Sequence, residues 1–264
     1  MEKATEELNK GDKLYCLGEL VHNEEITKEL ENKGMTFIEN INEAKGKVII
    51  RAHGEPQETY KQADKLGLEV IDLTCPKVAR IHNIAKEFTS KNYYIFLTGK
   101  KNHPEVIGIA GFCSNNYYII EDNNNIEEAV DNFKKSGYDK VLLISQTTFS
   151  MEKFSNIHKI LLEKLNEYNL ETINTICSAT KQRQEETLAI SKKAPAMVII
   201  GGKHSSNTTK LYDIAKEHAV TFFIQTADEL EIDKIKKYNL VGVMAGASTP
   251  YKSIKKVIDK LEKI

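Results

Sequence analysis

The stretch IDLTCPKVARI, residues 71–81, passes from an apolar segment through Cys75 and Pro76 into a helical pattern. Proline suits the first turn of a helix, because its missing N–H would have no partner there. The same arrangement returns 102 residues further on, in INTICSATKQRQ at residues 173–184, around Cys177. Two cysteines placed alike, each between a strand and a helix, predict a repeated chain and two parts of one site.

Two further units repeat along the chain, and each occurs three times. In one, a strand ends on a glycine, and a histidine or serine opens a helix four positions later: Gly18 and His22, Gly99 and His103, Gly201 and Ser205. In the other, a strand ends in a polar turn: His53, Gln146 with Thr147, and Ser248. The alternation of apolar runs and helical stretches predicts α/β domains with parallel sheets. We expect them over residues 1–74, 75–176 and 177–247, with a C-terminal helix over 248–264.

The spacing of the repeats raises the question of a missing element. Cys75 precedes Gly99 by 24 residues, and Cys177 precedes Gly201 by the same interval. The corresponding position before Gly18 would fall upstream of the first residue, where the chain opens in a helical pattern. We therefore hypothesise that roughly 20 N-terminal residues, with a strand and a third cysteine, are absent. The alternative is a first copy that diverged and never had this element.

The composition narrows the classes of function. With 37 basic and 38 acidic residues in 264, the chain has no bulk charge that would attract nucleic acid or a membrane surface. No apolar run approaches the length of a membrane span and no signal peptide is recognisable, so a cytoplasmic protein is expected. Four cysteines without an export signal argue against a disulfide framework and favour free thiols or metal ligands.

Polar side chains gather where the predicted strands end and helices begin. Ligands bind at this edge of a parallel sheet, and helix N-termini present free N–H groups that favour anions. The candidates are His22, His53, His103, Glu105, Thr147, Ser205, Ser206, Asn207 and Ser248. Histidines, hydroxyls and amides suit phosphate oxygens, whereas three histidines could instead bind zinc, although no HExxH spacing is present. Each residue taken alone is also explained as a helix cap, a first-turn acid or a solvent-facing side chain.

The four cysteines divide into two pairs. Cys75 and Cys177 open helices, where the thiolate form is favoured and binds metals well. Cys16 lies inside an apolar strand and Cys113 follows a helix, so both are expected in the core.

Eight motifs, in order across residues 13–253, resemble those of the 4-hydroxy-3-methylbut-2-enyl diphosphate reductase family: LGELVHN, RAHG, DLTCP, NHPEV, SQTT, TICSAT, SSNT and AGAS. The resemblance implies three similar α/β domains with mostly parallel sheets around a pseudo-threefold axis. It also implies an enzyme that removes the hydroxyl group of this diphosphate and gives isopentenyl and dimethylallyl diphosphate. That reaction is the last step of the methylerythritol phosphate route to isoprenoids.

The same resemblance implies a site. Cys75 and Cys177 would be two of three cysteine ligands of a four-iron–four-sulfur cluster. Glu105 would donate a proton, with Thr147 in a hydrogen-bonded relay, and electrons would come from a donor such as ferredoxin or flavodoxin. The diphosphate contacts would be His22, His53, His103, Ser205, Ser206, Asn207 and Ser248.

Two features depart from the family pattern. The GFCxGV motif of the first ligand is absent, since GFCS at residues 111–114 follows a helix in the second expected domain, and His204 stands where asparagine is usual. A cluster held by two protein thiolates would be labile, and a first domain that lacks a strand would be less stable. The alternative is therefore a non-catalytic diphosphate-binding protein without a stable cluster. An ordinary phosphate-binding transferase is disfavoured, because no glycine-rich loop of the dinucleotide or Walker A type is present.

Overall fold

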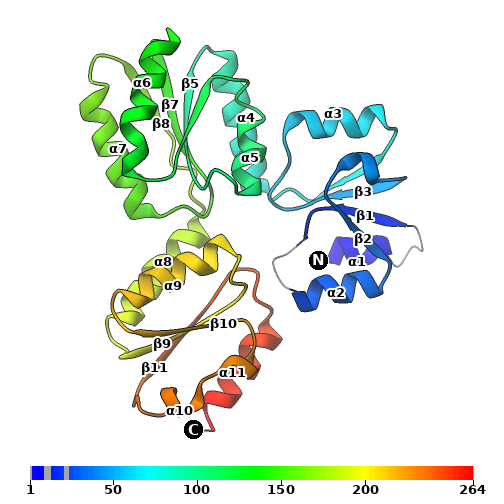
Figure 1. The fold of residues 1–264 in the computed structure, drawn as a ribbon, viewed down its shortest axis with the longest axis vertical. Coiled ribbons are helices and arrows are strands. Elements are labelled where there is room, and N and C mark those ends of the chain that lie inside the picture. The colour runs from blue at the N-terminus through cyan, green and yellow to red at the C-terminus, as the bar shows by residue number, and fades with distance from the viewer. Residues whose placement is uncertain (1, 9–12, 21–23, 264) are drawn as a thin grey trace. The chain divides into compact units, whose positions relative to one another are not determined.

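The computed structural model describes residues 2–8, 13–20 and 24–263, which form three sheets with helices between the strands (Figure 1). All strand pairs in these sheets are parallel. The α/β class with parallel sheets that the sequence predicts is confirmed. Parallel neighbours need crossover connections, and the helices between successive strands supply them.

Three successive segments build the sheets. The first contains α1 (Glu2–Leu8), β1 (Leu14–Leu17), α2 (Glu24–Asn32), β2 (Met35–Ile38), the short turn η1 (Ile41–Glu43), β3 (Lys47–Ile50), α3 (Gln57–Lys65) and β4 (Glu69–Asp72). The second contains α4 (Pro76–Ser90), β5 (Tyr94–Thr98), α5 (Pro104–Ala110), β6 (Tyr117–Ile120), η2 (Asn123–Asn125), α6 (Ile126–Ser136), β7 (Lys140–Ser145), α7 (Met151–Lys164) and β8 (Asn169–Thr172). The third contains α8 (Ser178–Ser191), β9 (Ala196–Ile200), α9 (Ser206–Lys216), β10 (Val220–Ile224), η3 (Ala227–Glu229), α10 (Ile232–Ile235), β11 (Val241–Ala245) and α11 (Tyr251–Leu261).

The internal repeat of the sequence reappears as a repeated topology. The strand orders are β2-β1-β3-β4, β6-β5-β7-β8 and β10-β9-β11. The chain divides into two compact units, one holding the first two sheets and the other, from Cys177 onward, holding the third. The further division of the first unit into two domains stays a prediction.

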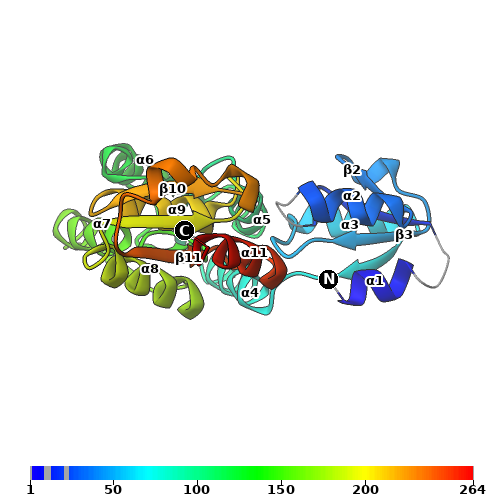
Figure 2. The ribbon, with the colours of Figure 1, turned by 90° about the horizontal axis from the view of Figure 1, so that it is seen from below.

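The central strands of each sheet are buried on both faces. In the second sheet, β5 and β7 are continuous apolar runs, and their alternate residues enter two separate core clusters. One cluster includes α6 and α7, and the other includes α4 and α5, so helices cover both faces of the sheet (Figure 1). Helices also flank the strands in the view from below (Figure 2). A strand that is covered on both faces has a continuous apolar sequence and not an alternating one. The central strands could therefore be predicted from their apolar runs.

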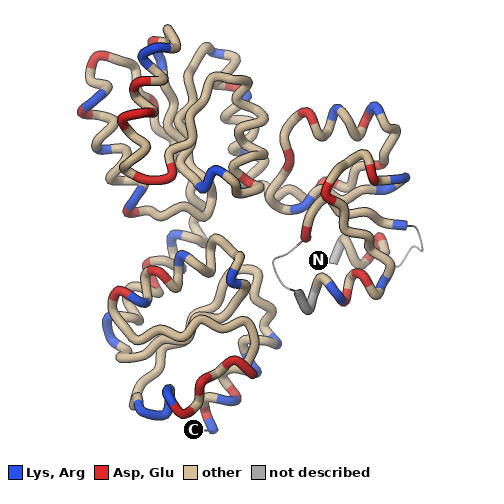
Figure 3. Tube along the Cα trace, in the orientation of Figure 1, with Lys and Arg blue, Asp and Glu red and all other residues tan. Residues whose placement is uncertain are grey.

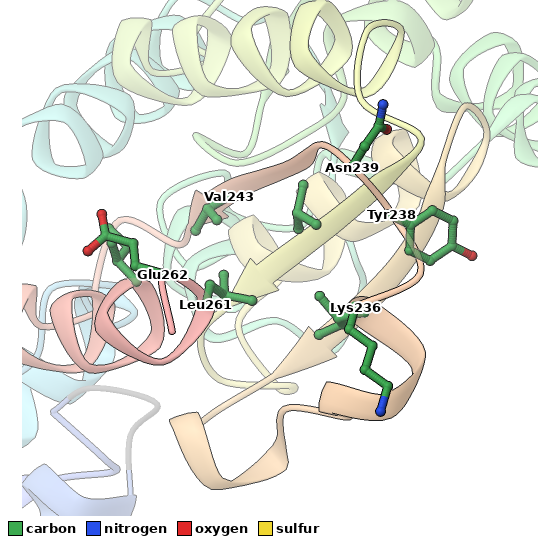
Figure 4. A pocket seen from close by; sticks show the side chains of 9 residues that line it. Lys236, Tyr238, Asn239, Val243, Leu261 and Glu262 are labelled. Carbon is green, nitrogen blue, oxygen red and sulfur yellow. The ribbon is translucent and has the colours of Figure 1, made fainter. Parts of the chain in front are cut away.

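The third sheet has one strand fewer than the other two. β4 pairs with β3 and β8 with β7, and Val70 and Leu170 from these fourth strands pack against the core. Among the described residues, no strand pairs with the outer edge of β11. A cavity of about 400 Å³ borders β11 instead, lined by Val243 of β11, Leu261 of α11 and Tyr238 of the connecting loop (Figure 4). The first sheet already has four strands, so the expectation that the first domain lacks a strand stays a prediction that this topology does not favour.

Charged residues occur mostly in helices and loops, and the strands contain few of them (Figure 3). Lysines and acidic residues alternate over the same helices, in agreement with the balanced composition. None of the helices in the described part of the chain has the length and apolar character needed to cross a bilayer.

Candidate functional site

Cys75 and Cys177 are the N-cap residues of α4 and α8. The sequence suggests that each strand runs directly into its cysteine, and this is wrong: β4 and β8 end several residues earlier. After β4 the carboxylate of Asp72 accepts a hydrogen bond from the Thr74 N–H at 2.9 Å, which turns the chain out of the strand. The Cys75 N–H then donates to the Ala52 carbonyl at 3.0 Å, so the segment stays attached to the end of the neighbouring strand.

Two histidines come together within the first unit. His53 lies in the turn after β3, and His103 is the N-cap residue of α5, where its Nδ1 accepts a hydrogen bond from the Glu105 N–H at 3.1 Å. The two rings meet edge to face, with centroids 5.3 Å apart. Because both side chains are only partly exposed and lie at strand ends, they form a concentrated pair of hydrogen-bonding groups.

Glu105 is the buried carboxyl group of this region, and only 2% of it is exposed. Thr147 donates two hydrogen bonds to it, from its N–H to Oε1 at 2.6 Å and from its hydroxyl to Oε2 at 2.8 Å. Burial raises the pKa of Glu105 to about 7, although both hydrogen bonds from Thr147 act in the opposite direction. The carboxyl group can therefore carry a proton at neutral pH and still release it.

The N-terminus of α9 offers a second group of donors, in the other unit. The Ser205 hydroxyl accepts a hydrogen bond from the Thr208 N–H at 3.4 Å, which leaves its own proton available. Asn207 is 8% exposed, and its Nδ2 has no hydrogen-bond partner among the described residues. A buried amide donor without a partner at a helix N-terminus is a suitable group for an anion. Ser206 is the first residue of α9, and Ser248 is exposed in the loop after β11.

The cysteines fit an iron–sulfur cluster only in part. Cys75 and Cys177 are partly exposed free thiols at helix N-termini, and thiolates are the usual ligands of such clusters. Cys16 and Cys113 are fully buried in the core, and burial raises the pKa of each to about 12, so neither can serve as a third ligand. No group of three metal-binding side chains occurs in the described part of the chain. The residues present thus supply two suitable ligands and do not complete the set.

One predicted residue, His22, lies outside the described residues. Two further polar residues of the first unit, Arg51 and His82, are not predicted as site residues from the sequence. The guanidinium group of Arg51 occupies the space beside Gly18, with its Nε 3.6 Å from Oε1 of Glu55. The sequence feature that could have identified Arg51 is its position as a charged residue directly after the apolar strand β3. His82, 4% exposed, lies on α4, and its signal was its place in the buried stripe of that helix.

The comparison with protein families gives a match over nearly the whole chain. The profile of the family described as LytB protein matches residues 1–262. The 4-hydroxy-3-methylbut-2-enyl diphosphate reductase of Caldanaerobacter subterraneus subsp. tengcongensis is 42% identical over 271 residues, covering 100% of this chain and 91% of that protein. The protein of the same name from Clostridioides difficile is 39% identical over 267 residues, covering 100% of this chain and 94% of that protein.

Solved structures give the same result. The structure described as the E-1-hydroxy-2-methyl-but-2-enyl-4-diphosphate reductase from Plasmodium falciparum matches with a TM-score of 0.90 at 29% identity. It covers 98% of this chain and 81% of that chain. A structure described as (E)-4-hydroxy-3-methyl-but-2-enyl diphosphate reductase, the terminal enzyme of the non-mevalonate pathway, matches with a TM-score of 0.69 at 37% identity. It covers 100% of this chain and 93% of that chain.

Proposed function

The chain belongs to the LytB protein family, and from this premise we propose that it reduces 4-hydroxy-3-methylbut-2-enyl diphosphate, the compound after which its relatives are named. The reaction breaks the bond between carbon and the hydroxyl oxygen. Two electrons and two protons are consumed, the oxygen leaves as water, and the products are isopentenyl and dimethylallyl diphosphate. The step would end the non-mevalonate route to isoprenoids.

The observation that carries this proposal is the buried Glu105 carboxyl group. A pKa of about 7 means that a large fraction of this group holds a proton at neutral pH, as a proton donor must. Thr147 fixes both carboxyl oxygens and can pass a proton through its hydroxyl. Glu105 also lies in the first turn of α5, two residues after His103, so the acid and the histidine pair share one helix end.

Diphosphate binding is assigned to the polar groups at strand ends. His53 and His103 would donate hydrogen bonds to phosphate oxygens, as would the Ser205 hydroxyl, Ser206 and the Asn207 amide. The buried, unpartnered Nδ2 of Asn207 supports this assignment, because a bound phosphate oxygen would satisfy it. His22 and Ser248 complete the proposed set on the strength of the motifs alone.

Cys75 and Cys177 are proposed as ligands of a four-iron–four-sulfur cluster. When bound, such a cluster would supply the electrons and act as a Lewis acid toward the substrate hydroxyl. The residues of this chain would bind the diphosphate and hold the proton at Glu105. Electrons would reach the cluster from a small carrier such as ferredoxin or flavodoxin. A cytoplasmic location stays a prediction from the sequence.

For the third ligand, we propose a cysteine at the end of a strand that pairs in parallel with the outer edge of β11. The repeat supports this place, because the fourth strands β4 and β8 precede Cys75 and Cys177. The cavity beside Val243 and Leu261 supports it as well, since it borders β11 (Figure 4), while Val70 and Leu170 of the fourth strands pack against the cores of the other two sheets.

The alternative function is diphosphate binding without a stable cluster. It is favoured by one observation, the lack of a third accessible cysteine among the described residues. It predicts that pyrophosphate binds while iron does not.

The test measures iron and acid-labile sulfide per chain after anaerobic reconstitution. This chain is compared with one extended at its N-terminus by a strand-and-cysteine segment copied from residues 69–75. We expect about four irons in the extended chain and fewer in this one, because clusters normally rely on three or four protein thiolates. In the extended chain, Cys75→Ser and Cys177→Ser should each lower the iron content, while Cys113→Ser, a change in the core, should not. If neither chain binds iron but both bind pyrophosphate, the alternative function replaces the reductase.

A further inference from the structure

His82 is a buried histidine to which the proposed function gives no role. It lies on the inner face of α4 with Val78, Ile81 and Ala85, and it is 4% exposed. Burial lowers the pKa of its imidazole to about 4, so the ring is neutral at pH 7. Its Nε2 has no hydrogen-bond partner among the described residues. A leucine would fill a similar space without burying an unpaired polar atom, so stability alone does not explain the imidazole.

The ring of His82 is held between three segments of the first unit. Phe112 stacks on it, with centroids 4.4 Å and planes 20° apart. Gly54 faces its edge so closely that a Cβ atom at Gly54 would overlap Cε1. A Cβ atom at Gly108 would lie 3.3 Å from the Gly54 carbonyl oxygen and 3.4 Å from Nε2 of His82. The ring therefore touches the turn that contains Gly54 and borders the helix that contains Gly108.

These two segments carry the histidine pair. Gly54 directly follows His53, and Gly108 belongs to α5, which begins after His103 and contains Glu105. The position of the His53–Gly54 turn relative to α5 therefore determines the distance between the ring centroids of His53 and His103, which is 5.3 Å. Gly54 itself has φ +69, a left-handed conformation that favours glycine, and its missing Cβ leaves room for the imidazole beside the turn.

We propose that His82 is a positioning residue for the diphosphate-binding histidines, because its flat ring holds the turn of His53 at a fixed distance from α5. This inference rests on the proposed function, in which His53 and His103 bind the diphosphate. A flat ring can stack on Phe112 and still lie against Gly54. A branched side chain of similar volume would press into the turn and displace His53 from His103.

The experiment uses two variants of the chain. His82→Leu replaces the flat ring by an apolar side chain of similar size. Ile81→Ala leaves a cavity one position earlier on the same helix, in the core cluster that contains Ile95 and Leu142, so it is the matched control for loss of stability. Pyrophosphate affinity is measured by calorimetry, the unfolding midpoint in urea by circular dichroism, and the ring signals of His53 and His103 by NMR.

We expect His82→Leu to weaken pyrophosphate binding by up to roughly 100-fold, by analogy with the loss of rate that a misplacement of about 1 Å can cause. Its unfolding midpoint should fall no further than that of Ile81→Ala, and the ring signals of His53 and His103 should shift. Ile81→Ala should lower the midpoint and leave affinity and ring signals unchanged. A structural role alone would make stability and affinity fall together in both variants.

The proposal is overturned if His82→Leu keeps the normal affinity and ring signals, or if Ile81→Ala changes them equally. If the unaltered chain binds no pyrophosphate, the proposed diphosphate site fails. The NMR signals of the His53 and His103 rings then test the positioning role separately. A shift of these signals in His82→Leu but not in Ile81→Ala supports the role. Equal signals in the two variants overturn it.

Discussion

Glu105 makes the stability of the first unit depend on pH. Its pKa in the folded chain is about 7, above the ordinary value of 4.5, so the folded state keeps a proton that the unfolded state releases. The free energy of unfolding should therefore fall as pH rises from about 4.5 to about 7. The shift corresponds to on the order of 3 kcal/mol.

Glu105→Gln should remove this contribution, because an amide carries no charge at any pH, while its oxygen can still accept from the Thr147 N–H. Urea unfolding of both chains across this pH range tests the prediction. The exposed Glu167→Gln serves as the control and should follow the unaltered chain. Parallel curves for the unaltered chain and Glu105→Gln would show that Glu105 is not protonated in the folded state.

Some of these residues could be predicted from the sequence and some could not. Glu105 and Thr147 were selected through a resemblance in their motifs, whereas the hydrogen bonds between them join residues 42 positions apart, which no local pattern reveals. Burial also gives Glu105 its pKa, and burial depends on the packing of α5 against the sheet. The role of His82 has the same origin, because its contact with Gly54 exists only in the folded unit.

The helix N-termini provide a matched pair of serines. Ser205 caps α9 and Ser150 caps α7, each accepting a hydrogen bond at 3.4 Å from a backbone N–H three residues later. Both side chains are buried. Ser205→Ala and Ser150→Ala should each cost about 1 kcal/mol of stability through loss of the cap.

Only Ser205→Ala should also weaken pyrophosphate binding, by roughly tenfold, because its hydroxyl proton is the one assigned to a phosphate oxygen. Calorimetric titration of both variants with pyrophosphate checks this. If both variants bound pyrophosphate with equal affinity, Ser205 would act only as a helix cap.

The elements themselves were largely predictable, and their ends were less so. Proline at the first turn marked the starts of α4 and α5 correctly. The ends of β4 and β8 are not predictable in this way, because apolar and polar residues are mixed before Cys75 and Cys177 and form side-chain hydrogen bonds and single backbone contacts instead of a ladder. One repeated feature is apparent only from the burial in the structure. The residue seven positions after Cys75 and after Cys177, His82 and Gln184 respectively, is polar and buried.

For the whole chain, the decisive feature is the third sheet with three strands. Val243 packs against the core of the third sheet and lines the cavity beside β11, so an aspartate there would bring a charge next to any strand added beside β11, at a cost of several kcal/mol. In the extended chain, Val243→Asp should therefore lower the iron content after reconstitution. Val220→Asp, on β10 at the opposite edge and 51% exposed, should leave it unchanged. If the two variants held equal amounts of iron, the proposal that the added strand pairs with β11 would be wrong.

The repeat could be found in the sequence, but the sheet that the proposed additional strand would join could not. Spacing alone assigned the absent strand to the first domain, since it would precede α1 in the chain. In a parallel sheet the order of strands in space differs from their order in the chain, and β3 already has β4 beside it. Only the topology shows that, among the described residues, the third sheet has three strands and the other two have four.

The burial of Cys16 and Cys113 determines how this chain responds to oxidants. Peroxide and alkylating agents attack the thiolate, and a buried thiol with a pKa of about 12 almost never takes that form. Chemical damage will therefore concentrate on the two partly exposed thiols, Cys75 and Cys177. A chain stored in air can keep its fold and core intact while losing both proposed metal ligands, so an inactivated sample would still look native by every measure of folding.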